Sequence, residues 1–165
     1  MSLTFGDASD RDVLALARLR TLAAVRLTEE HGKGHWSTPI SEAAVRRGFA
    51  HARVIVVRDA GEAVGTLRLA TKKPWAIDLK YFTKAGRALY LTDMAVDPAY
   101  QRRGVGRALL GEALAVARGW PADAVRLDAY DAPAGAGPFY ASCGFREVGR
   151  ASYRGVRLIY FEKLL

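Results

Sequence analysis

The sequence has only one cysteine, Cys143, so no disulfide can form within the chain. Such low cysteine usage is typical of proteins in a reducing compartment. No apolar stretch reaches the roughly eighteen residues that cross a membrane, and the pattern of a secretory signal peptide is missing. We therefore expect a soluble, cytoplasmic protein with no membrane partner. Whether Met1-Ser2-Leu3 belongs to the native N-terminus stays open at this point.

Clustered charge is also missing, although 25 Lys and Arg against 17 Asp and Glu give a net charge of +8. A basic protein attracts polyanions. However, the basic residues are dispersed, and no nucleic-acid-binding module is recognisable. A phosphate-rich small molecule is therefore a simpler partner than nucleic acid. Because no linker, repeat or change of composition divides the chain, we expect a single domain over residues 1–165.

Apolar periodicity and turn residues predict alternating helices and strands. The pattern favours one helix over about 11–28 and a second that ends near residue 50. The strand 125–130 follows the strand 89–96 through a helix, so these two strands should be parallel neighbours with a right-handed crossover. The other expected elements are a hairpin of strands 54–58 and 63–70, a short helix over 138–143, and antiparallel strands over 145–149 and 157–164.

The most informative stretch, residues 89–110, joins a strand, a glycine turn and a helix. Gly104 and Gly106 allow a close approach of the backbone, and the amides that begin a helix attract an anion. The lysine and hydroxyl of a P-loop are absent, and Leu109 stands where a dinucleotide fingerprint needs its third glycine. The alternative is an ordinary turn whose glycines only permit tight packing.

The spacing Gln-x-x-Gly-x-Gly over residues 101–106 resembles the coenzyme A pyrophosphate loop of the GNAT superfamily of N-acetyltransferases. Residues 138–145 resemble the Tyr-x-x-x-Gly-Phe signature of the same family. The resemblance implies an α/β (α+β) fold with a mixed, mostly antiparallel sheet, a central splayed parallel strand pair and about four flanking helices. It also implies acetyl-CoA as cosubstrate, no metal, and direct transfer of acetyl to a primary amine in a ternary complex.

The resemblance further assigns roles to residues of the cosubstrate site. The pantetheine arm is expected along the backbone of Met94, Ala95 and Val96. The pyrophosphate is expected on the loop that contains Gln101, Arg102, Arg103, Gly104, Val105, Gly106 and Arg107. Pro133 stands where many family members have an asparagine, so the contact from that asparagine must be absent or replaced.

Tyr140 matches the tyrosine of the family signature, whose phenol is implied as the general acid at the sulfur. The alternative is a core tyrosine with a satisfied hydroxyl.

Asp93 and Asp128 each interrupt an apolar strand, where a carboxylate is costly unless it is partnered or faces a cleft. Burial would raise the pKa of either carboxyl group and suit a general base. An ion pair with a nearby arginine is the alternative for each. The position of Asp128 also matches an acidic residue of GNAT enzymes that resemble ribosomal alanine N-acetyltransferases.

Two segments rich in aromatic residues are expected to form the walls of an acceptor site. Residues 32–39 contain Trp36, and residues 72–86 combine four lysines with Trp75, Tyr81 and Phe82. The alternative is that these aromatic side chains cover the core. The lysines disfavour a polycationic acceptor, so we expect a small amine or amino-acid-like metabolite with one cationic nitrogen.

Three other functions stay open from the sequence. The chain could be a non-catalytic acyl-CoA-binding regulatory module, which the presence of Tyr140 disfavours. It could also acetylate a protein N-terminus or lysine. A nucleic-acid binder is disfavoured by the dispersed charge. A homodimer is neither indicated nor excluded.

Overall fold

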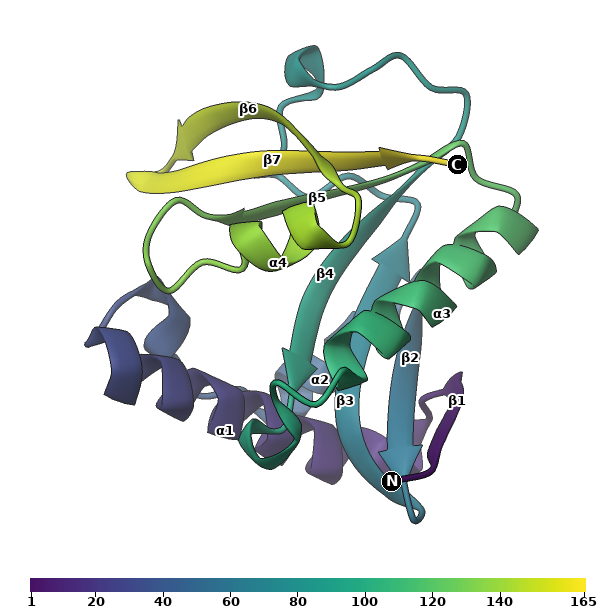
Figure 1. The fold of residues 1–165 in the computed structure, drawn as a ribbon, viewed down its shortest axis with the longest axis vertical. Helices are drawn as coiled ribbons and strands as arrows, with labels where there is room; N and C mark the ends of the chain where they lie inside the picture. Colours follow the sequence, from purple (N-terminus) through teal and green to yellow (C-terminus); the bar gives the residue numbers. More distant parts are fainter.

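The computed structural model describes residues 1–165 and contains one seven-stranded sheet in the order β1-β2-β3-β4-β5-β7-β6 (Figure 1). All neighbouring strands are antiparallel except β4 and β5, which are parallel. The predicted mixed sheet with four helices and a central parallel pair is therefore confirmed. The strands are β1 (Leu3–Asp7), β2 (Ala52–Asp59), β3 (Glu62–Ala70), β4 (Ala88–Val96), β5 (Ala124–Tyr130), β6 (Arg146–Tyr153) and β7 (Val156–Leu164). The α-helices are α1 (Val13–His31), α2 (Glu42–Gly48), α3 (Val105–Gly119) and α4 (Gly137–Ser142).

The hairpin of β2 and β3 is formed by two apolar strands joined at Ala60 and Gly61. Both turn residues have positive φ, 49° and 85°, as a tight hairpin turn requires. Side chains alternate between the two faces of β2. Val57 belongs to the core under α3, whereas Val56 packs against α1 and α2. Helices therefore cover both faces of this part of the sheet, which explains why the hairpin is almost continuously apolar.

The parallel pair of β4 and β5 is joined at one end only. Residues 88–90 pair with residues 124–126, and beyond them the two strands diverge (Figure 1). A β-bulge lies in the diverging part of β4, where Asp93 has a φ of 56° and the register against β3 shifts. A bulge bends its strand and increases the local twist. The outer halves of β4 and β5 therefore line the two sides of an opening in the sheet.

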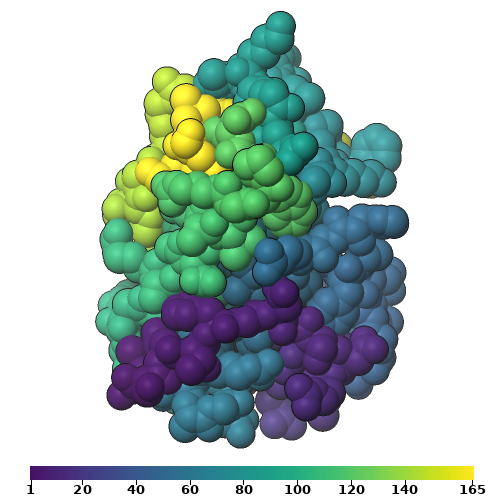
Figure 2. Space-filling model, turned by 90° about the vertical axis from the view of Figure 1, so that its right-hand side faces the viewer, coloured from purple at the N-terminus to yellow at the C-terminus, as the bar shows by residue number.

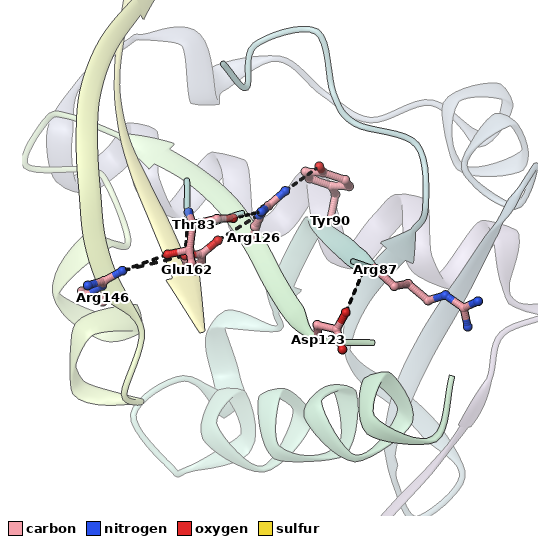
Figure 3. Close-up of polar contacts among 7 residues, drawn as sticks. All are labelled: Thr83, Arg87, Tyr90, Asp123, Arg126, Arg146 and Glu162. Atoms are coloured by element: carbon pink, nitrogen blue, oxygen red, sulfur yellow. Dashed lines mark hydrogen bonds and ion pairs between the residues drawn. The ribbon is translucent and has the colours of Figure 1, made fainter. Parts of the chain in front are cut away.

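A buried ion pair lies at the closed end of this opening (Figure 3). Arg126 Nε of β5 donates to Glu162 Oε2 of β7 at 2.9 Å, with only 7% and 1% of the two side chains exposed. Arg126 also donates to the Tyr90 hydroxyl at 3.2 Å and to the carbonyl of Thr83, whose amide donates to Glu162 Oε1 at 3.2 Å. These bonds fasten segment 72–86 to β4, β5 and β7. The rest of that segment projects at the top of the molecule in Figures 1 and 2.

The structure differs from the sequence predictions mainly near the N-terminus. Strand β1 was not predicted; it pairs with β2 at the edge of the sheet and lies at the lower surface in Figure 2. The Ser2 amide donates to Asp59 Oδ1 at 2.9 Å, so the first residues are part of the fold. Helix α1 begins two residues and ends three residues later than expected. A 3₁₀ turn over residues 10–12 precedes it, held by the Ser9 amide, which donates to Asp12 Oδ2.

None of the helices combines the length with the apolar composition needed to cross a bilayer. The structure also has no group of three or more His, Cys, Asp or Glu side chains placed to hold a metal ion.

Candidate functional site

A cavity of about 480 Å³ lies where β4 and β5 diverge. This volume is within the range of roughly 300–1,000 Å³ that is typical of small-molecule sites. Helix α1, residues 35–40, β4, β5 and the segment that leads into α4 contribute the wall, which is mostly apolar. Asp93, Asp128 and Tyr140, the three residues predicted to carry the chemistry, all line it.

Tyr140 lies in α4, and its side chain is buried against Phe139, Phe145 and Phe161. Its hydroxyl contacts Met94 Sδ of β4 at 3.5 Å. A thioether sulfur is a weak acceptor, so the phenol has no strong acceptor within the protein. Burial, and next the negative charge of Asp128, raise the pKa of Tyr140 well above its usual range. The phenol therefore keeps its proton at neutral pH and can donate it to a strongly basic atom.

Asp128 lies in β5, where its backbone pairs with Tyr160 of β7. Its carboxylate forms neither an ion pair nor a hydrogen bond within the protein, although much of the residue is covered. Burial raises the pKa of this carboxyl group. The ion pair considered from the sequence is therefore not formed at Asp128, and its oxygens are free to accept a proton from a molecule in the cavity.

Asp93 behaves differently because it lies at the bulge of β4. Its Oδ1 is 3.0 Å from Arg20 Nη2 of α1, so the alternative of an ion pair with a nearby arginine is the one that this residue adopts. The contact also joins the bulge to α1 across the floor of the cavity. The two carboxylates are thus distinct, one neutralised by an arginine and the other unpaired.

The loop between β4 and α3 presents a row of free backbone donors. The amides of residues 102–107 donate no hydrogen bond within the protein. Gly104 has a φ of 82°, a left-handed conformation that β-branched side chains rarely adopt, and it precedes the first turn of α3. Unpaired amides at the start of a 15-residue helix form a site for an anion. The loop therefore has the geometry that a pyrophosphate group requires.

Gly106 has a different role from Gly104. A Cβ atom at Gly106 would lie 3.4 Å from the Phe139 ring and 3.7 Å from Met94 Cε, whereas one at Gly104 would meet open space. Gly106 thus permits close packing of α3 against α4 and β4. Gln101 supports the loop in a third way, because its Nε2 donates to the Val96 carbonyl at 3.0 Å.

The diverging edge of β4 carries the predicted pantetheine residues. Met94 and Ala95 line the cavity, and residues 91–96 have no ladder partner on the side of β5. An extended ligand backbone at this edge would meet unpaired strand groups. The Val96 carbonyl already accepts the hydrogen bond from Gln101, and Ala95 pairs with Thr66 of β3 on the other side of the strand.

The structure separates the four aromatic residues expected at the acceptor site. Trp36 lines the cavity, and its ring packs edge-on against Tyr130 of β5 at 5.7 Å. Tyr81 and Phe82 instead pack against Tyr160, each at 5.4 Å, and cover a small core cluster. Trp75 is 80% exposed and lines no part of the cavity. The cavity therefore has a wall from residues 35–40 but none from segment 72–86. Tyr81 and Phe82 of that segment follow the alternative considered from the sequence, in which the aromatic side chains cover the core.

Several lining residues were missed by sequence reasoning. Arg20 and Tyr130 carried no motif, and only the fold brings them to the same cavity as Asp128. Thr92 Oγ1 is the single buried side-chain oxygen or nitrogen without a hydrogen-bond partner, and Thr92 also lines the cavity. Its signal in the sequence was its position beside Asp93 in an otherwise apolar strand.

The comparisons with known proteins agree with this geometry. The model of the acetyltransferase (GNAT) family matches residues 17–145. No curated protein sequence matches the chain significantly. The chain is similar in structure to the PaiA N-acetyltransferase from Thermoplasma acidophilum in complex with coenzyme A, with a TM-score of 0.76, 14% identity and 100% of both chains covered.

Two further solved structures have the same fold. The N-acetyltransferase from Staphylococcus aureus Mu50 aligns with a TM-score of 0.74 and 15% identity over 99% of both chains. The ribosomal-protein-S18-alanine N-acetyltransferase from Escherichia coli aligns with a TM-score of 0.72 and 20% identity over 99% of this chain and 94% of that one. Since the family model spans most of the sequence and includes β4, the glycine loop and Tyr140, the chain belongs to the acetyltransferase (GNAT) family.

Proposed function

We propose that the protein is an acetyl-CoA-dependent N-acetyltransferase that transfers acetyl directly to the primary amine of a small molecule within a ternary complex. One observation carries this proposal. The unpaired carboxylate of Asp128 and the protonated phenol of Tyr140 line a single cavity, beside a row of free amides that suits a pyrophosphate.

Three features of the chain fit coenzyme A. The amides of residues 102–107 would hold the pyrophosphate, with Gly104 providing the turn and Gln101 fixing the start of the loop. Met94 and Ala95 at the open edge of β4 would pair with the pantetheine arm. Bound acetyl-CoA would supply a thioester carbonyl carbon as the electrophile.

Asp128 would act as the general base. An amine arrives mostly as an ammonium ion, and its nitrogen needs a free electron pair before it can attack. The carboxylate accepts one proton, directly or through water, and releases it to solvent. Its raised pKa brings it closer to that of the group it deprotonates, which favours the transfer.

Tyr140 would act as the general acid. As the nitrogen–carbon bond forms and the carbon–sulfur bond breaks, the electron pair of that bond stays on sulfur, and the phenol protonates the leaving thiolate. The second proton lost by the nitrogen restores the phenol. The products are an acetamide, free coenzyme A and one proton in solution.

The rival hypothesis of a non-catalytic acyl-CoA-binding module makes no use of Asp128. A regulatory site would gain nothing from an unpaired, covered carboxylate, which costs stability. The enzyme proposal gives this carboxylate a role, so it is the one we favour.

The test is release of free thiol from acetyl-CoA in the presence of an amine panel, together with calorimetric titration with coenzyme A. Tyr140→Phe is expected to lower kcat by roughly ten- to a thousandfold with little change in coenzyme A affinity. Tyr153→Phe, in the distant β6–β7 turn, is the matched control and should leave both unchanged. Coenzyme A binding without thiol release from any amine would support the regulatory module instead.

A further inference from the structure

We propose that the acceptor is a primary amine with an apolar or aromatic body, a single cationic nitrogen and no carboxylate. This inference rests on the proposed acetyl transfer and deepens it, because it excludes both free amino acids and polyamines. Three properties of the cavity carry it: its charge balance, the composition of its wall and the contact that closes one side.

The charge balance of the cavity leaves one negative group. Apart from His35 and the phenols of Tyr130 and Tyr140, its only ionisable lining residues are Arg20, Asp93 and Asp128. Arg20 and Asp93 neutralise each other at 3.0 Å. Asp128 remains as the single carboxylate for one ammonium group. No lysine lines the cavity, the one arginine is paired with Asp93 and His35 stacks on Tyr130, so a carboxylate on the acceptor would find no unengaged cation. A second ammonium group would likewise find no second free anion.

The part of the cavity wall that comes from α1 and residue 40 is mostly apolar. Helix α1 contributes Ala23, Ala24 and Leu27, and Ile40 follows from the connection to α2. The two alanines leave space that a larger side chain would fill. Removing an alkyl chain or ring from water against such a wall stabilises the complex by roughly 25 cal/mol per Å² of apolar surface. A polar or charged body would lose its hydration there without compensation.

Aromatic rings close one side of the cavity. His35 stacks on Tyr130 with centroids 6.5 Å apart, and Trp36 meets the same ring edge-on at 5.7 Å. Trp36 Nε1 donates to the Gly32 carbonyl at 3.0 Å, so the polar atom of the indole is already satisfied. These contacts join the connection between α1 and α2 to the end of β5. An extended peptide would have to part them, whereas a small amine with a ring could pack against them.

The test uses pairs of amines that differ in one charge. Phenethylamine and phenylalanine differ by the carboxylate, and hexylamine and hexamethylenediamine differ by the second ammonium group. We expect kcat/KM for the first member of each pair to be higher by about tenfold or more, since a buried unpaired charge is strongly disfavoured. Equal or better activity on phenylalanine, on the diamine or on a peptide with a free N-terminal alanine would overturn the inference.

A variant pair tests whether the body of the amine lies against α1. Ala24→Leu narrows the cavity and should raise KM for phenethylamine by about tenfold while KM for methylamine changes little. Ala43→Leu makes the same change on the exposed surface of α2, outside the cavity, and serves as the matched control. A uniform effect on both amines, or none on either, would contradict this placement.

Titration of the coenzyme A complex with the same amines separates this inference from the proposed function. Preferential binding of phenethylamine without turnover would refute the transferase and support the specificity of the cavity. Turnover without preference between the members of a pair would support the transferase and refute the specificity of the cavity. If coenzyme A binds but phenethylamine and phenylalanine bind with equal affinity, the specificity is refuted whatever the activity.

Discussion

Replacing Asp128 and Asp93 by asparagine, one at a time, should change stability in opposite directions. Burial raises the pKa of Asp128, so the folded protein holds this proton more tightly than the unfolded chain does. The free energy of unfolding therefore falls as the pH rises from near the pKa of the unfolded chain, about 3.9, through the raised pKa of the folded protein. Asp128→Asn removes this loss and should stabilise the protein at neutral pH by on the order of 1 kcal/mol.

Asp93→Asn removes a partner from Arg20 instead. The pair has good geometry at 3.0 Å, but 41% of the Asp93 side chain and 17% of the Arg20 side chain are exposed. Water screens such a pair, so its loss should cost about 0.2–1 kcal/mol. For a chain of this size, about 1 kcal/mol corresponds to a shift in Tm of roughly 2–4 °C, so the two variants should lie on either side of the wild type.

Calorimetric melting near pH 7 and near pH 4, together with turnover, checks both variants. The stabilising effect of Asp128→Asn should shrink at the lower pH, where more of the wild-type carboxyl group is protonated. Its turnover should fall by about a hundredfold or more, whereas Asp93→Asn should keep most of its activity. An inactive Asp93→Asn beside an active, destabilised Asp128→Asn would show that the roles of the two carboxylates have been assigned the wrong way round.

Three further pairs of substitutions test other parts of the structure. Gly104→Val forces a β-branched residue to a φ of 82° and should abolish coenzyme A binding in calorimetry. Arg103→Ala should weaken binding only modestly. Equal affinities for wild type and Gly104→Val would contradict the assignment of the loop. Glu162→Leu leaves the Arg126 guanidinium buried without its partner and should lower the free energy of unfolding, measured by urea denaturation, by about 3–5 kcal/mol. Adding Arg126→Met to the same chain should restore most of this loss. A loss below about 1 kcal/mol for Glu162→Leu alone would contradict the buried pair. Trp36→Ala should raise KM for an aromatic amine by about tenfold, because Trp36 lines the cavity. Trp75→Ala tests the wall predicted from segment 72–86, and KM should not change if the cavity is the acceptor site.

The sequence predicted most of the sheet because its strands follow simple rules. The β2–β3 hairpin combines two apolar strands with a glycine turn, and the loop before α3 has glycines at the required spacing. Strand β1 escaped prediction since only two of its five residues, Leu3 and Phe5, are apolar and it packs at an edge. Its pairing with β2 is a long-range contact that no local pattern announces.

Part of the candidate site was also predicted, because Tyr140 and the glycine loop belong to short motifs that can be recognised in the sequence. The difference between Asp93 and Asp128 depends on the bulge in β4 and on Arg20, which lies more than seventy residues away in the chain. The aromatic residues of segment 72–86 carry no local signal that separates the wall of a site from a cover of the core. Only the distances from Tyr81 and Phe82 to Tyr160 show where they pack.

The narrow junction between β4 and β5 has a mechanical consequence. β4 and β5 pair only along residues 88–90 and 124–126, so the strand ladder between the two halves of the sheet has its hinge there. Arg126 and Tyr90 belong to the hinge, and the hydrogen bond between them ties one half to the other. A small rotation there becomes a larger displacement at the far ends of the strands, where Met94 of β4 and Asp128 of β5 both line the cavity. The width of the cavity therefore depends on a cluster that does not line it, and it can be altered at the hinge without any change to the cavity wall.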